Sequence, residues 1–148
     1  MADLNVTYVS LLIIVLLLAT IQDIKKFAIS NILTFTGMLA GLVLHMSYAG
    51  QVGLWYSARG LIAGFVIGEI AALITKMGQG DVFLLAALGS FIGPMLVMEA
   101  FLFTLTVLFI RFSPTFLKGH VLHQKVPVAP YIAIGTILAL ILEFVMQD

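Results

Sequence analysis

The chain has 148 residues, of which 62% are hydrophobic and 9% are charged, and its formal net charge is zero. So few polar side chains cannot cover the surface of a water-soluble domain, and the composition therefore predicts an integral membrane protein. Zero net charge provides no field that would attract nucleic acid, and the absence of cysteine excludes disulfides, thiolate catalysis and cysteine-ligated zinc.

Long apolar runs, separated by clusters of charge, glycine or proline, predict the transmembrane helices. In chain order they cover residues 4–22, 29–48, 58–75, 82–92, 95–110 and 128–146. The first run lacks the basic leader of a secretory signal and is expected to be the first span. The fourth has about 11 residues, which cover roughly 17 Å of a bilayer core of about 30 Å. A kinked helix through Gly93 and Pro94 would join it to the fifth run and leave five spans.

The positions of lysine and arginine favour six spans over five, because these residues gather in cytoplasmic loops. Five spans would divide the basic residues almost evenly, whereas six leave Arg59 alone on one side. We therefore predict an all-α polytopic bundle of about six transmembrane helices, with a short fourth helix and both termini outside. Residues 1–148 are expected to form a single domain. The basic residues on the predicted cytoplasmic side are Lys25, Lys26, Lys76, Arg111, Lys118 and Lys125.

Two aspartates lie at the edges of apolar runs, where acidic residues are functional candidates. Asp23 follows the first run, Asp81 precedes the fourth, and six spans place both at the cytoplasmic face. Paired carboxylates cleave peptide bonds when one is ionised and takes a proton from water while the other donates a proton to the carbonyl oxygen. Gly78 and Gly80 would let the chain leave helical geometry beside Asp81 and hold an extended substrate. Taken alone, Asp81 also fits a helix N-cap, and Asp23 fits an interfacial ion pair with the lysines that follow it.

The third run carries a regular series of small residues and one acidic residue. Small residues at every fourth position make a groove in which a neighbouring helix can pack. Glu69 lies about two turns inside the end of the run and is expected to be protonated, paired or functional. The small residues are Gly60, Gly64 and Gly68.

Both aspartate segments resemble the type IV prepilin peptidase family. Residues 23–31 read Asp-Ile-Lys-Lys-Phe-Ala-Ile-Ser-Asn, and residues 78–89 read Gly-Gln-Gly-Asp-Val-Phe-Leu-Leu-Ala-Ala-Leu-Gly. In that family the first catalytic aspartate is followed by basic residues and Ile-Pro-Asn, and the second ends a Gly-x-Gly-Asp motif. Residues 126–131 resemble the proline-containing start of its last span. The matching positions are Asp23, Ile29 and Asn31 in the first segment and Gly78, Gly80, Asp81, Leu84 and Gly89 in the second.

The resemblance implies a membrane aspartic endopeptidase with Asp23 and Asp81 as the catalytic pair and Gly78 and Gly80 in the active-site loop. No metal or cofactor is expected. The implied partner in the bilayer is a prepilin-like substrate (a pilin, pseudopilin or archaellin precursor), cleaved after the glycine of a short basic leader at the cytoplasmic face. The family's larger members carry a cysteine-containing segment that accompanies methylation, so a peptidase-only form is expected. Residues predicted to contact substrate or support the site are Lys25, Lys26, Asn31 and Glu69.

Two positions depart from the family pattern, and two other classes of function compete with the peptidase. Ser30 replaces a proline, which is expected to alter only the stiffness of a helix start. Phe83 replaces a lysine, which removes a cation near Asp81 and alters the local electrostatics. The competing classes are a small ion- or proton-coupled transporter or channel subunit and a catalytically silent assembly subunit. A transport path needs polar groups throughout the membrane depth, whereas both motif aspartates lie at one face.

Overall fold

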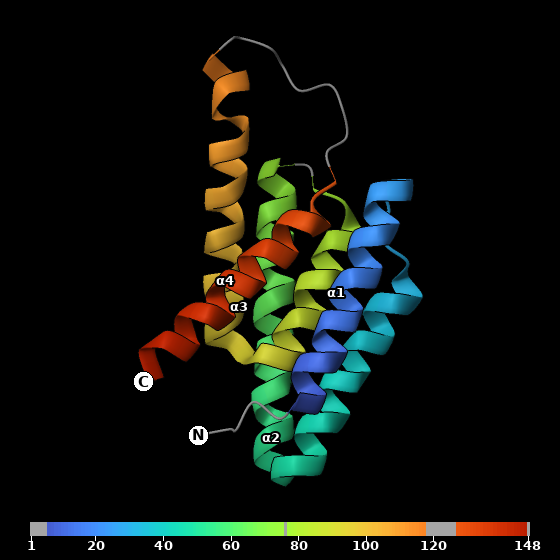
Figure 1. Cartoon of the computed structure of the whole chain (residues 1–148). Coiled ribbons are helices and arrows are strands. Elements are labelled where there is room, and N and C mark those ends of the chain that lie inside the picture. Colours follow the sequence, from blue (N-terminus) through green and yellow to red (C-terminus); the bar gives the residue numbers. More distant parts are fainter. Residues whose placement is uncertain (1–5, 76, 118–126, 148) are drawn as a thin grey trace.

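In a computed structural model of the chain, the described residues, 6–75, 77–117 and 127–147, form four helices. The prediction of an all-α fold is confirmed for these residues, whereas the count of six helices is wrong. The second and third apolar runs belong to one helix, which a single glycine, Gly50, interrupts. The fourth and fifth runs likewise belong to one helix, which Gly93 interrupts. The predicted cytoplasmic residues Lys76, Lys118 and Lys125 lie outside the described residues. The helices are α1 (Val6–Lys26), α2 (Asn31–Thr75), α3 (Gln79–Leu117) and α4 (Ala129–Gln147) (Figure 1).

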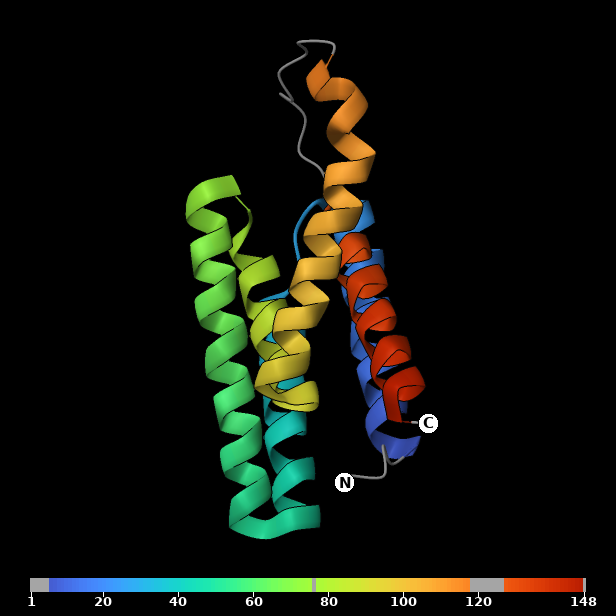
Figure 2. The same cartoon turned by 90° about the vertical axis from the view of Figure 1, so that its left-hand side faces the viewer.

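The long helix α2 reverses its direction at Gly50. This residue has φ 59° and ψ −138°, and the parts of α2 before and after it run back along each other as a hairpin (Figure 2). Glycine adopts a positive φ without the steric cost that a Cβ atom imposes. The reversal returns the end of α2 to the end of the molecule at which α2 began, which determines where α3 starts.

Helix α3 reverses in the same way at Gly93, which has φ 82° and ψ 177°. Two hydroxyl groups of α2 bind the carbonyls that precede this turn. The Tyr56 hydroxyl donates to the carbonyl of Ile92 at 3.0 Å, and the Ser57 hydroxyl donates to the carbonyl of Ser90 at 2.7 Å. The last carbonyls of a helix have no partner within it, and in apolar surroundings an unpaired carbonyl is costly. These hydrogen bonds therefore allow the helix to end inside the protein.

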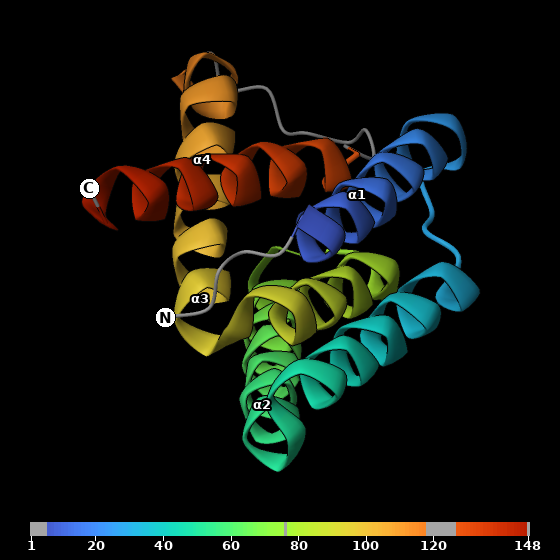
Figure 3. The same cartoon turned by 60° about the horizontal axis from the view of Figure 1, so that its bottom comes forward.

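The first part of α3, residues 79–92, lies at the centre of the bundle between α1 and the two parts of α2 (Figure 3). Leu84, Leu85 and Leu88 of this part are fully buried. The predicted groove of small residues faces it, and the prediction that this groove seats a neighbouring helix is confirmed. Cβ atoms added to Gly60, Gly64 and Gly68 would meet atoms of Gly89, Leu85 and Val82, respectively.

All four helices are long and apolar enough to cross a membrane. Large apolar side chains cover their outer surfaces, as at Ile32 and Leu73, which are 77% and 84% exposed. Such side chains are stable facing lipid and would be unfavourable in water. The chain is therefore a multi-pass membrane protein.

Candidate active site

The two motif aspartates lie at the same end of the bundle. Asp23 is in the last turn of α1, and Asp81 is in the first turn of α3. The end of α1 and the start of α3 come together because α2 turns back at Gly50 (Figure 1). A straight helix as long as α2 would have carried Asp81 to the opposite end of the molecule.

Asp23 is buried, with 4% of its surface exposed, and contacts the beginning of α4. Its Oδ2 atom accepts a hydrogen bond of 2.8 Å from the backbone N–H of Ala129, the first residue of that helix. In the sequence, the segment 126–131 is distinguished only by its prolines. Because a backbone N–H carries no sequence signature, its pairing with Asp23 was not predicted.

Asp81 is also buried, with 7% of its surface exposed. Within the described part of the chain, Oδ1 of Asp81 has no hydrogen-bond partner. The backbone N–H of Asp81 donates to the carbonyl of Gly78 at 3.0 Å, which forms the turn that opens α3. The two aspartate carboxyl groups are close enough to interact electrostatically. The structure thus brings together the two residues that the sequence predicted as a pair.

The two glycines before Asp81 have different surroundings, and the prediction that both release the chain from helical geometry is wrong. Gly78 precedes α3, whereas Gly80 is already helical, and neither has a positive φ. A Cβ atom on Gly80 would lie 3.1 Å from Cβ and 3.2 Å from the backbone N of Ile29. A Cβ atom on Gly78 would make only an ordinary contact, 3.5 Å from Oδ2 of Asp81. Gly80 therefore serves close packing of α3 against the α1–α2 connection.

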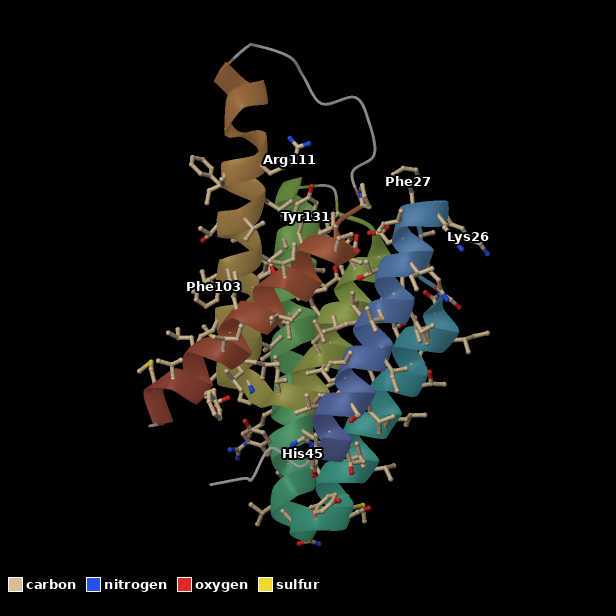
Figure 4. All side chains as sticks on the ribbon, viewed as in Figure 1. Lys26, Phe27, His45, Phe103, Arg111 and Tyr131 are labelled. Carbon is tan, nitrogen blue, oxygen red and sulfur yellow. The ribbon has the colours of Figure 1, made fainter. Side chains whose placement is uncertain are left out.

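The predicted supporting residues come from the end of α1 (Lys25 and Lys26) and from α2 (Asn31 and Glu69), and within the described part of the chain their side chains make no hydrogen bond to either aspartate. Lys25, Lys26 and Asn31 are exposed, and the side chain of Lys26 points away from the bundle (Figure 4). Glu69 is half-buried. Among the described residues, none of these four side chains makes a hydrogen bond or ion pair, so the interfacial ion pair considered for Asp23 is not formed there.

Both departures from the family pattern take part in local interactions. The backbone N–H of Ser30 donates to Oε1 of Gln22 at 2.8 Å, a bond that proline cannot make. Gln22 was missed in the sequence, although an amide next to Asp23 in an apolar helix was an available signal. The ring centroid of Phe83 lies 5.5 Å from that of Phe35 and 6.3 Å from that of Phe65. Two helical residues span about 200°, so Phe83 faces α2, away from the side of α3 on which Asp81 lies.

Comparison with known proteins identifies the family. Residues 10–142 match the type IV leader peptidase family. The chain is 33% identical over 140 residues to a prepilin leader peptidase/N-methyltransferase of Bacillus subtilis (strain 168), covering 90% of this chain and 53% of the relative. It is 31% identical over 135 residues to a protein of the same name from Aeromonas hydrophila, covering 86% of this chain and 46% of the relative.

The chain thus spans about half the length of these curated relatives. No solved structure matches it. The family match extends over both aspartate motifs and includes parts of all four helices. The chain belongs to the type IV leader peptidase family.

Proposed function

We propose that this chain is a membrane aspartic endopeptidase that removes the leader from prepilin-like precursors. The observation that carries the proposal is that two buried aspartates, Asp23 and Asp81, lie at the same end of an apolar helical bundle. Family membership supports it, as do the names of the two relatives, both prepilin leader peptidases.

The proposed chemistry needs one ionised and one protonated carboxyl group. Two carboxyl groups held close in apolar surroundings favour this state, because the first negative charge opposes the formation of the second. The ionised group takes a proton from water as the water oxygen attacks the scissile carbonyl carbon, and the protonated group donates to the carbonyl oxygen. The product of this attack is a tetrahedral diol. The group that took the proton from water then gives it to the leaving nitrogen, while a hydroxyl of the diol returns a proton to the other carboxylate, and the C–N bond breaks. The pair ends in its starting state.

The proposed substrate has a short basic leader ending in glycine, followed by an apolar helix. The helix would lie in the bilayer, and the leader would stay at the face where the aspartates lie. Lys26 and Arg111 are at the aspartate end of the bundle (Figure 4), which supports a cytoplasmic location for this end. A cytoplasmic site would meet the leader before the precursor is exported.

The test is cleavage of a co-expressed prepilin-like substrate by the native chain and by Asp23→Asn and Asp81→Asn variants at matched expression. We expect each variant to lose cleavage by at least about a hundredfold, because loss of a general acid or base has effects of this size. Glu99→Gln is the control, since Glu99 is an exposed carboxylate on the part of α3 that follows the Gly93 turn. Full activity of either aspartate variant would remove that residue from catalysis, and no cleavage by the native chain would favour a non-catalytic role.

A further inference from the structure

Among the first three residues of α4, the N–H of Ala129 is the one that bonds outside the helix start, and its acceptor is Asp23. The N–H groups of the first residues of a helix have no partner within its regular hydrogen bonding. In α4 the second of these residues is Pro130, which has no N–H, and the N–H of the third, Tyr131, donates to the carbonyl of Val128 at 3.0 Å. The remaining N–H, that of Ala129, donates to Oδ2 of Asp23 at 2.8 Å.

This bond differs from an ordinary surface contact in two respects. It is buried, because Asp23 is 4% exposed and Ala129 is fully buried. It also lies at the N-terminus of α4, where the helix dipole and the free N–H both favour a negatively charged partner. The start of α4 therefore holds the Asp23 carboxyl in one orientation and suits its ionised form.

Asp81 has a contrasting environment. Its Oδ1 atom is buried, and no donor reaches it from any described residue. An ionised carboxyl with an unpaired buried oxygen is more costly than a neutral acid in the same place. The two members of the pair are thus distinguished by what surrounds them, although the sequence presents them as equivalent aspartates.

We propose that the N-terminus of α4 is a positioning element that holds Asp23 as the ionised base of the pair and leaves Asp81 as the proton-donating acid. This inference rests on the proposed function. Asp23 then accepts the proton of the attacking water and later gives it to the leaving nitrogen. Asp81 gives its proton to the carbonyl oxygen and recovers one from the diol as the C–N bond breaks. Ala129 takes no part in proton transfer and acts only through Asp23.

Ala129→Pro tests the positioning role, because it removes this one N–H at a helix position where proline fits well. We expect kcat to fall roughly tenfold to a hundredfold with KM within about twofold, since the substrate still binds while the base is misoriented. Ala129→Gly keeps the N–H and should keep kcat near the native value. Replacing Ala129 with lactic acid, which forms a backbone ester without N–H and without a ring, should lower kcat in the same way if the proline variant folds poorly. Native kcat in the ester variant would overturn the proposal.

The assignment of base and acid has a separate test in chemical rescue. Formate is a small carboxylate base at neutral pH, so we expect it to restore measurable cleavage to Asp23→Gly and not to Asp81→Gly. Rescue of Asp81→Gly alone would reverse the assignment. If the native chain cleaves and needs both aspartates while removal of the Ala129 N–H has no effect, only the positioning role fails. If the native chain does not cleave, the proposed function fails, and the inference fails with it.

Discussion

At the scale of single residues, the two glycines of the second motif show how one residue type serves two purposes. Gly80 lies against the backbone of Ile29, where even a methyl group would be too close to its neighbours. Gly78 lies outside α3 with space for a side chain. The close approach of α3 to the connection between α1 and α2 therefore depends on the absence of a Cβ at Gly80.

Gly80→Ala should reduce leader cleavage by about tenfold or more, because a shift of α3 by a few tenths of an ångström moves Asp81 relative to Asp23, and catalysis is sensitive to such displacement. Gly78→Ala should cleave at a rate close to that of the native chain. Cleavage rates of the two variants at matched expression provide the measurement. Equal losses would show that both glycines act through backbone flexibility, as the sequence first indicated.

At the scale of helices, α2 and α3 depend on one glycine each for their reversal, but the surroundings of these glycines differ. Gly50 has open space where a Cβ would be placed. At Gly93 the ring of Tyr56 occupies that space, and its hydroxyl binds the carbonyl of Ile92. The turn of α3 is thus packed into the bundle, whereas the turn of α2 projects from it.

Alanine at either turn should lower thermal stability in detergent, with the larger effect at Gly93. Gly50→Ala should cost about 1–2 kcal/mol, the strain of a positive φ with a Cβ atom. Gly93→Ala imposes a comparable strain and also displaces the Tyr56 ring, so this variant should unfold at a distinctly lower temperature than Gly50→Ala. A similar loss of stability in both variants would contradict the packed turn at Gly93.

At the scale of the whole molecule, the chain passes back and forth so that the ends of α1 and α2 and the beginnings of α2, α3 and α4 gather at one end (Figure 1). The aspartates lie at this end, and the turn at Gly50 lies at the other. Two exposed residues, Lys26 at the aspartate end and Gln51 beside the turn, therefore report on opposite faces of the membrane.

Single cysteines in this cysteine-free chain can establish its orientation. We expect a membrane-impermeant maleimide to label Gln51→Cys in intact cells and to label Lys26→Cys only after the membrane is opened. This result would support a cytoplasmic site, because Lys26 is three residues from Asp23. Labelling of Lys26→Cys from outside would place the aspartates at the external face and contradict the proposed route of the substrate.

The sequence by itself determined the membrane environment, the positions of the apolar segments and the two aspartates proposed as the catalytic pair. These follow from local properties: apolar side chains partition into lipid, and an acidic residue beside an apolar run is conspicuous wherever the chain folds. The number of helices was wrong because hydropathy does not show whether a glycine such as Gly50 interrupts a helix for one residue or for a longer loop.

Only the tertiary structure decided how the aspartates differ. The bond from the Ala129 N–H to Asp23 joins residues 106 positions apart and involves a backbone group that every residue except proline possesses. The burial of Asp81 Oδ1 without a hydrogen-bond partner among the described residues likewise depends on which helices pack together, as does the close contact of Gly80 with Ile29. A sequence identifies which residues carry chemical groups, whereas the environment that makes two identical groups unequal exists only once the helices are assembled.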